Sequence, residues 1–326
     1  MTSPLSELVG AAGCRYLLKQ LIQERPHLGR VWLATSGQDK FILKDIPKSI
    51  FSSFNKDIRP RLRESPFLRL SHDTIPDQQI FVYKYMDDDF LSLVRKQIPM
   101  QARKQILKAS LRGIAELHSH NIVHLDIKPD NIMINYCGTG KETIVKKVQI
   151  IDLENAAYLP KGRCIKGMLA GNDSWRSPEG HFKASLASLL TFSPSQLWYV
   201  ALLCIYAMLG QVIFEADEDL QKHESQGAFP HIIRLQRQVS FFGDREGLNG
   251  LMKHVGDEEI NCQVLRFLWD DRAADYHSYK PFSDWPNVND DKFKDVIHSM
   301  THLDPQKRAT AREVLEHPWF AGCELY

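Results

Sequence analysis

Short apolar runs separated by turn residues dominate the beginning of the chain. Val31–Ala34 and Lys40–Lys44 are two such runs, and they flank the turn sequence Ser36-Gly37-Gln38-Asp39. This arrangement predicts a β-hairpin. Ile80–Tyr85 is a further predicted strand, and the polar stretch Ser52–Arg63 predicts a helix that Pro60 should break or kink.

A helical period replaces the strand pattern after Met86. Apolar residues then recur at spacings of four and three, at Leu107, Leu111, Ile114 and Leu117. This spacing predicts an amphipathic helix. Trp198–Phe214 is mostly apolar over 17 residues, which is the lower limit of length for a membrane span, so we interpret it as a buried core helix.

The order of these elements predicts an α+β fold with two lobes, a small β-rich lobe and a larger, mainly helical lobe. Within the helical part, Ile132–Ile134 and Val148–Ile151 are short predicted strands, and Thr310–Glu313 is a capping box for a last helix. We place an N-terminal extension at residues 1–15, the small lobe at 16–85 and the large lobe at 86–326. A cleft between two such lobes is a usual place for a small-molecule site.

Composition narrows the class of protein. Lys and Arg number 41 and Asp and Glu 40, so the chain lacks the large basic surface that nucleic acid or an anionic membrane requires. None of the six cysteines lies within four residues of another, which argues against a local zinc or redox pair. Met1–Gly10 has no signal-peptide pattern. We therefore expect a protein of the cytoplasm or nucleus that does not insert into a membrane.

The strongest candidate for chemistry is the polar run His124–Asn131, which lies between the amphipathic helix and a predicted strand. Phosphoryl transfer requires a carboxylate to accept the proton of the attacking hydroxyl, a cation near the phosphate and oxygen ligands for Mg²⁺. Asp126, Lys128 and Asn131 could supply all three from one loop. The competing interpretation is a polar loop that matches by accident, and the neighbouring motifs argue against it.

This run resembles the catalytic loop of protein kinases. The resemblance extends from about Tyr16 to Phe320. It implies that Asp126 is the catalytic base, Lys128 the phosphate-neutralising cation and Asn131 a metal ligand. Lys128 is similar to the serine/threonine pattern of the family rather than to the tyrosine pattern.

A second match follows a predicted strand, at Asp152-Leu153-Glu154. It resembles the kinase motif D-F-G, which implies that Asp152 binds Mg²⁺ at the phosphates. Considered alone, an Asp at this place could equally cap the strand end. Glu154 departs from the family glycine and adds negative charge beside the metal site.

The small lobe contains weaker matches. Lys44 resembles the strand lysine that holds the α- and β-phosphates of ATP. We expect Asp57 to be its acidic partner, with Glu64 as the alternative. Tyr85 and Met86 match the segment between the lobes where backbone groups meet adenine.

The glycine-rich loop of the family is only partly present. Gly29 and Val31 match its last glycine and its valine, whereas Glu24 and Pro26 stand at the first two glycine positions. Pro26 also lacks a backbone N–H that could bind a phosphate oxygen.

Two further matches lie in the large lobe. Ser177-Pro178-Glu179 resembles the end of a kinase activation segment, which implies an ion pair between Glu179 and Arg308. Gln196 stands where kinases have an Asp that ties the catalytic loop to a buried helix, and an amide makes this bond without charge assistance.

The resemblance implies an ATP- and Mg²⁺-dependent kinase that phosphorylates serine or threonine of protein substrates. Two alternatives remain open. One is a pseudokinase scaffold, suggested by Glu24, Pro26, Glu154 and Gln196. The other is a small-molecule phosphotransferase, against which Lys128 and the Glu179–Arg308 match argue. Leu125, which precedes the catalytic Asp, cannot bind an activating phosphate, so we expect control by a regulatory partner or by expression.

Overall fold

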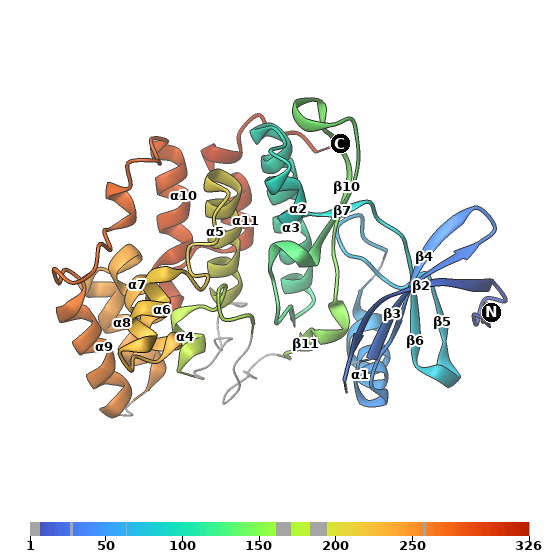
Figure 1. The fold of residues 1–326 in the computed structure, drawn as a ribbon, viewed down its shortest axis with the longest axis horizontal. Helices are drawn as coiled ribbons and strands as arrows, with labels where there is room; N and C mark the ends of the chain where they lie inside the picture. Colours follow the sequence, from blue (N-terminus) through green and yellow to red (C-terminus); the bar gives the residue numbers. More distant parts are fainter. Residues whose placement is uncertain are drawn as a thin grey trace.

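The chain folds into two lobes, with the β-rich lobe at the right of Figure 1 and the helical lobe at the left. The computed structural model describes residues 7–26, 29–62, 64–160, 171–182, 194–256 and 259–325. The predicted α+β class is confirmed. The boundaries between extension and lobes stay a prediction; residues 1–6 of the extension lie outside the described part, and Glu7–Val9 pairs with the sheet of the small lobe.

A single antiparallel sheet forms the small lobe, with strand order β1-β2-β3-β4-β6-β5. Its strands are β1 (Glu7–Val9), β2 (Arg15–Arg25), β3 (Gly29–Ser36), β4 (Asp39–Asp45), β5 (Asp73–Ile75) and β6 (Ile80–Lys84). The predicted hairpin is β3–β4, whose register pairs Ser36 with Asp39 and Val31 with Lys44. Gly37 in its turn has φ +59°, a left-handed conformation that glycine adopts without strain.

The helical segment of the small lobe begins earlier than the sequence predicted. Helix α1 covers Lys48–Ser53 and continues as a π-helical turn, Phe54–Ile58. A 3₁₀ turn, Arg59–Arg61, contains Pro60 and ends the segment at Arg61. Because proline cannot donate the intrahelical hydrogen bond, the regular helix stops before it, as expected.

The large lobe combines short strands near the cleft with a helical body. Its strands are β7 (Asp88–Asp89), β8 (Ile122–Val123), β9 (Ile132–Cys137), β10 (Ile144–Ile150) and β11 (Ala157–Tyr158). Its helices are α2 (Phe90–Arg95), α3 (Met100–Ser119), α4 (Pro178–His181), α5 (Pro194–Leu209), α6 (Glu218–Ser225), α7 (Pro230–Phe242), α8 (Arg245–Val255), α9 (Glu259–Asp271), α10 (Asp291–Thr301) and α11 (Ala311–Glu316). Thr310 and Glu313 form the predicted capping box at the start of α11.

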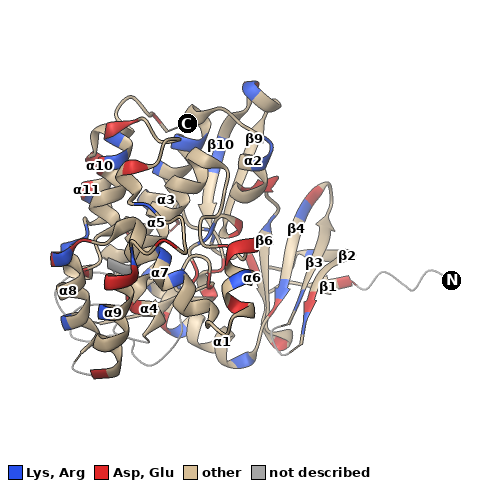
Figure 2. Ribbon diagram, turned by 60° about the vertical axis from the view of Figure 1, so that its left-hand side comes forward, with Lys and Arg blue, Asp and Glu red and all other residues tan. Residues whose placement is uncertain are grey.

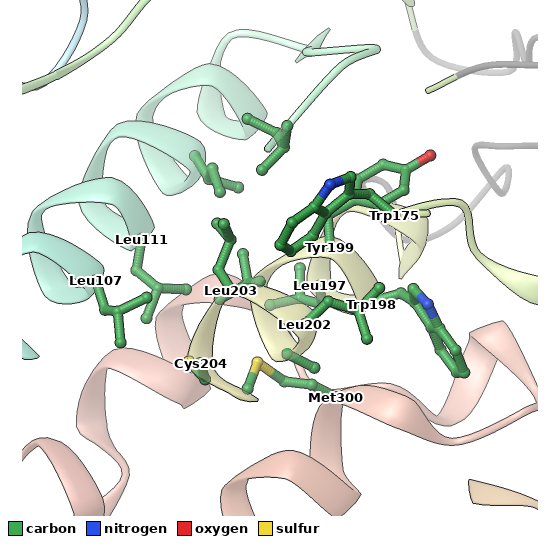
Figure 3. Packing of buried hydrophobic residues seen from close by; sticks show 14 of the residues in the cluster. Leu107, Leu111, Trp175, Leu197, Trp198, Tyr199, Leu202, Leu203, Cys204 and Met300 are labelled. Atoms are coloured by element: carbon green, nitrogen blue, oxygen red, sulfur yellow. The ribbon is translucent and has the colours of Figure 1, made fainter. Parts of the chain in front are cut away.

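Helix α5 is the centre of this body. It packs between α3, which contributes Leu107 and Leu111, and α10, which contributes Met300 (Figure 3). Its residues from Leu197 to Ala207 are buried, so the apolar run that begins at Trp198 supplies a core helix, as predicted. In the described part of the chain, no helix is both long and apolar enough to cross a bilayer.

The loop before β5 joins the small lobe to β10 of the large lobe. Arg69 N donates to Ile150 O at 2.9 Å, and Ile150 N donates to Phe67 O at 2.9 Å. These bonds fix the end of β10, and with it Asp152, against the small lobe. Basic and acidic residues occur on both lobes (Figure 2), in agreement with the near-zero net charge.

Candidate active site

A cavity of about 390 Å³ lies between the lobes and collects most of the predicted site residues. Its lining includes Gly29, Val31, Lys44, Asp126, Lys128, Asn131 and Asp152. These residues come from β3, β4, the loop after β8 and the end of β10, so the fold brings distant segments to one place.

The catalytic loop is held by bonds centred on Asp126. Lys128 Nζ lies 2.8 Å from Asp126 Oδ2. Asn131 Nδ2 donates to the same oxygen at 3.2 Å and to the backbone oxygen of Asp126 at 2.7 Å. The carboxylate, the ammonium and the amide therefore form one connected group, in which the Asn131 side-chain oxygen is not used by these bonds.

His124 ties this loop to the strand before Asp152. Its Nε2 donates to Ile151 O at 2.8 Å, and its Nδ1 accepts from Asp126 N at 3.1 Å. Burial lowers the pKa of His124, so the ring is neutral and this pair of bonds fixes its tautomer. The sequence contained His124 within the motif, but its bridging role depends on a contact across 27 residues.

Gln196 connects the catalytic loop to α5. Its Nε2 donates to His124 O at 2.6 Å, and its Oε1 is hydrogen-bonded to His118 Nε2. Burial lowers the pKa of His118 to about 4, so His118 is neutral and can donate from Nε2 alone. The amide thus keeps the loop attached to the helix although the family's Asp is absent.

Asp152 has φ 60° and ψ 34°, a left-handed conformation that is rare for a residue other than glycine. Its Oδ1 lies 2.9 Å from Lys44 Nζ. Burial opposes ionisation of Asp152, but the charge and hydrogen bond of Lys44, together with smaller contributions from His124 and Lys128, hold its pKa below the ordinary value. Asp152 is therefore ionised, as a metal ligand must be.

Lys44 does not pair with either residue that the sequence suggested. Its Nζ lies 2.5 Å from Glu154 Oε1, in addition to its contact with Asp152. Asp57 and Glu64 were wrong choices for a physical reason. The inward face of the α1 segment is apolar at Ile50 and Phe54, and Glu64 is exposed beside a different cavity.

The partly matching glycine loop closes on the end of β4. Gly29 has φ +103°, and a Cβ at this position would lie 2.1 Å from Asp45 O. Arg30 Nε forms an ion pair with Asp45 Oδ2 at 3.0 Å. Residues 27 and 28 of the predicted loop lie outside the described part. Arg25, which the sequence analysis did not single out, also lines the cavity and adds a positive charge to it.

Tyr85 and Met86 are separated from this group. They line a neighbouring cavity of about 650 Å³ together with residues of the loop before β5. Contact of their backbone with adenine stays a prediction.

The donor set suits Mg²⁺ bound together with phosphates. Asp152 and Asn131 offer oxygen ligands in one cavity, and Mg²⁺ is commonly held by one or two carboxylates and completed by substrate phosphates. Among the residues that the structure describes, no group of three or more His, Cys, Asp or Glu side chains could hold a metal by itself. Lys44 and Lys128 place positive charge in the same cavity, which favours a polyphosphate.

Glu179 and Arg308 meet away from the cleft, beneath the end of the activation segment. Arg308 Nη1 and Nη2 donate to the two carboxylate oxygens of Glu179 at 2.8 Å each, and both side chains are fully buried. Arg308 also lies over the ring of Trp198 in α5, with its Cζ 5.2 Å from the ring centroid. The pair therefore links the segment at residues 177–179 to the centre of the large lobe.

Comparison with known proteins agrees with this geometry. Residues 66–320 match the family model described as protein kinase domain. The chain is 29% identical over 252 residues to cyclin-dependent kinase B2-1 of Arabidopsis thaliana, covering 73% of this chain and 67% of the relative. It is 27% identical over 286 residues to the serine/threonine-protein kinase ssn3 of Aspergillus clavatus, covering 79% of this chain and 63% of the relative.

The family match spans most of the chain and includes the catalytic loop, the Asp152 segment and the Glu179–Arg308 pair. The kinase expectation drawn from the sequence is confirmed at this level, since the relatives are named as protein kinases. The chain belongs to the protein kinase family.

Proposed function

We propose that the chain is a catalytically active kinase that transfers the γ-phosphoryl group of ATP to serine or threonine hydroxyls of proteins. The observation that carries this proposal is the convergence of Lys44, Asp126, Lys128, Asn131 and Asp152 on one cavity. These residue types supply the parts that phosphoryl transfer requires: a base, cations at the phosphates and oxygen ligands for Mg²⁺.

Each residue has a distinct role in this proposal. Asp126 orients the substrate hydroxyl and accepts its proton, while Lys128, 2.8 Å from that carboxylate, neutralises charge on the transferring group. Lys44 holds the phosphates nearer the small lobe. Mg²⁺, held by Asp152 and Asn131, supplies charge neutralisation at the phosphates.

The proposal that the substrate is a protein serine or threonine depends on two features. Lys128 follows Asp126 with the spacing of the serine/threonine pattern, and one relative is named as a serine/threonine-protein kinase. The buried Glu179–Arg308 pair supports the segment that would position a protein substrate. We place this activity in the cytoplasm or nucleus, with a regulatory partner whose identity is open.

A pseudokinase scaffold is the competing function. The loop offers fewer backbone N–H groups to phosphates than the glycine-rich loop of the family. Pro26 has no N–H, and Gly29 is packed against Asp45. Two features favour catalysis instead. Arg25 adds positive charge to the cavity that would hold ATP. Gln196 holds the catalytic loop against α5 through its bond to His124. Turnover decides between the two functions.

The test is phosphate transfer from radiolabelled ATP with Mg²⁺ to a mixed peptide library containing Ser, Thr and Tyr acceptors. We expect transfer to Ser and Thr that Asp126→Asn lowers by about 10²–10⁴-fold. Asp270→Asn, on the exposed surface of α9, is the matched control and should transfer at the wild-type rate. Absence of transfer by the wild-type protein would favour the pseudokinase, and transfer to Tyr alone would refute the substrate class.

A further inference from the structure

We infer that Glu154, rather than a residue of the α1 segment, positions Lys44 for catalysis, so that placement of this lysine depends on the turn after Asp152 and not on α1. This inference rests on the proposed function. It gives a role to a residue whose identity departs from the family pattern.

Lys44 needs a carboxylate partner because it is mostly withdrawn from water. Its side chain is 20% exposed, and burial by itself disfavours its charged form. A flexible four-carbon chain with no partner would also sample many rotamers. In protein kinases an ion pair between the strand lysine and a helix glutamate normally meets this need.

No carboxylate of the α1 segment, residues 48–61, pairs with Lys44, although Asp57 lies in its π-helical turn. Helix α1 has the sequence Lys-Ser-Ile-Phe-Ser-Ser, without an acidic residue. Ile50 lines the same cavity as Lys44. Phe54 is buried against Phe81, with ring centroids 5.2 Å apart. This face stabilises the lobe by apolar packing and cannot bind an ammonium group.

Glu154 meets the need from the opposite side. Its side chain is 2% exposed, and its Oε1 lies 2.5 Å from Lys44 Nζ. Its Oε2 accepts a hydrogen bond from the Tyr83 hydroxyl at 3.4 Å. Tyr83 is buried on β6, where it pairs with Ile42 of the neighbouring strand β4. Oε1 therefore forms an ion pair with Lys44, and Oε2 is hydrogen-bonded to the same sheet.

The turn and its contacts give Glu154 a fixed position. Leu153 is buried and lies with Glu154 in a 3₁₀ turn that Ala156 N closes on Leu153 O at 3.0 Å. The guanidinium of Arg69 covers the ring of Tyr83 at 5.0 Å from its centroid. Burial and the charge of Glu154 raise the pKa of Tyr83, so its hydroxyl stays a donor at neutral pH.

The arrangement assigns metal binding to one carboxylate, Asp152, and positioning of Lys44 to another, Glu154. Lys44 contacts both Asp152, at 2.9 Å, and Glu154. Mg²⁺ bound by Asp152 would compete with Lys44 for the same carboxylate. Glu154 would then remain the partner of Lys44. The metal ligand and the lysine anchor thus lie two residues apart on one turn, and a movement of this turn changes both.

Three matched carboxylate-to-amide variants test the inference. Glu154→Gln keeps the volume and the acceptor for Tyr83 but removes the charge, whereas Asp57→Asn and Glu64→Gln make the same chemical change on the α1 side. We expect Glu154→Gln to lower kcat/KM for ATP by about 10²-fold, the usual effect of a misplaced reactive group. We expect Asp57→Asn and Glu64→Gln to leave kcat/KM unchanged. The unfolding midpoint of each variant, measured in parallel, separates positioning from loss of fold.

A relocation variant makes the test specific. Ile50→Glu in the Glu154→Gln background returns a carboxylate to the same cavity from α1. We expect it to recover part of the lost kcat/KM, a result that a merely structural role of Glu154 would not produce. Wild-type kcat/KM in Glu154→Gln, a gain of activity in that variant, or a loss of equal size in Asp57→Asn would each overturn the inference.

A second readout is independent of turnover and so distinguishes this inference from the proposed function. The amine of Lys44 can be labelled with an acylating reagent and quantified by mass spectrometry, since its side chain is partly exposed. Glu154 and Asp152 contact the amine directly, at 2.5 and 2.9 Å, and so restrict its access to the reagent. Labelling should accelerate in Glu154→Gln and stay unchanged in Asp57→Asn. Equal rates in all variants would refute the anchor even if the wild-type protein is active.

Discussion

Removal of one partner of the Glu179–Arg308 pair should destabilise the large lobe strongly. Both side chains are fully buried and joined by two hydrogen bonds of 2.8 Å. Glu179→Ala leaves the Arg308 guanidinium buried with part of its bonding lost, although its Nε still donates to His302 O at 2.8 Å. Breaking a buried pair in this way costs about 3–5 kcal/mol.

This free energy translates into a measurable shift. At about 2 °C per kcal/mol, the lower end for large domains, the unfolding midpoint should fall by about 6–10 °C in Glu179→Ala and similarly in Arg308→Ala. The double variant removes both charges and leaves neither unpaired. It should therefore cost less than the sum of the single variants, with a coupling energy of about 0.5–3 kcal/mol.

Thermal and urea unfolding of the four proteins provide the measurement. Lys307→Ala is the matched control, since Lys307 precedes Arg308 and its pair with Glu246 is on the surface. Its unfolding midpoint should equal that of the wild type. Strict additivity of Glu179→Ala and Arg308→Ala would refute the contact, and an unchanged midpoint in either would refute its energetic importance.

The remaining predictions concern catalysis, metal, pH and modification. Asp126→Asn should lower turnover by about 10²–10⁴-fold while ATP binding persists, and loss of binding would contradict the assignment as base. Asp152→Ala should abolish the extra thermal stabilisation that Mg²⁺ adds to ATP; an unchanged shift would exclude the metal role. Because burial holds the pKa of His118 at about 4, below its unfolded value, its contribution to stability is complete above about pH 6.5 and is lost as the pH falls toward 4; a flat unfolding midpoint over that range would contradict this. Phosphatase treatment should leave turnover unchanged, and a large loss of activity would refute independence from activation-segment phosphorylation. The hydroxyl side chains between Asp152 and Glu179 are Tyr158, Ser174 and Ser177, of which Ser177 is fully buried.

The sequence alone determined the features that depend on local spacing. Asp126, Lys128 and Asn131 lie within six consecutive positions, so one loop must hold them close together whatever surrounds it. Apolar periodicity likewise predicted α3. The apolar run that begins at Trp198 predicted α5, and its length identified it as a core helix. These signals are strong because neighbouring residues share a backbone and need no distant partner.

Only the tertiary structure decided which carboxylate serves Lys44. Asp57, Glu64 and Glu154 are chemically similar, and nothing in their local sequence distinguishes a buried acid from a solvated one. The choice depends on the apolar face of α1 and on the turn that carries Asp152 and Glu154. This turn begins 108 residues after Lys44. The resemblance predicted that Gln196 ties the catalytic loop to α5, but only the structure shows that the bond goes to His124, 72 residues away. Packing between distant segments decides which acidic side chains are buried and how close they lie to Lys44. Burial and distance then decide which charges pair.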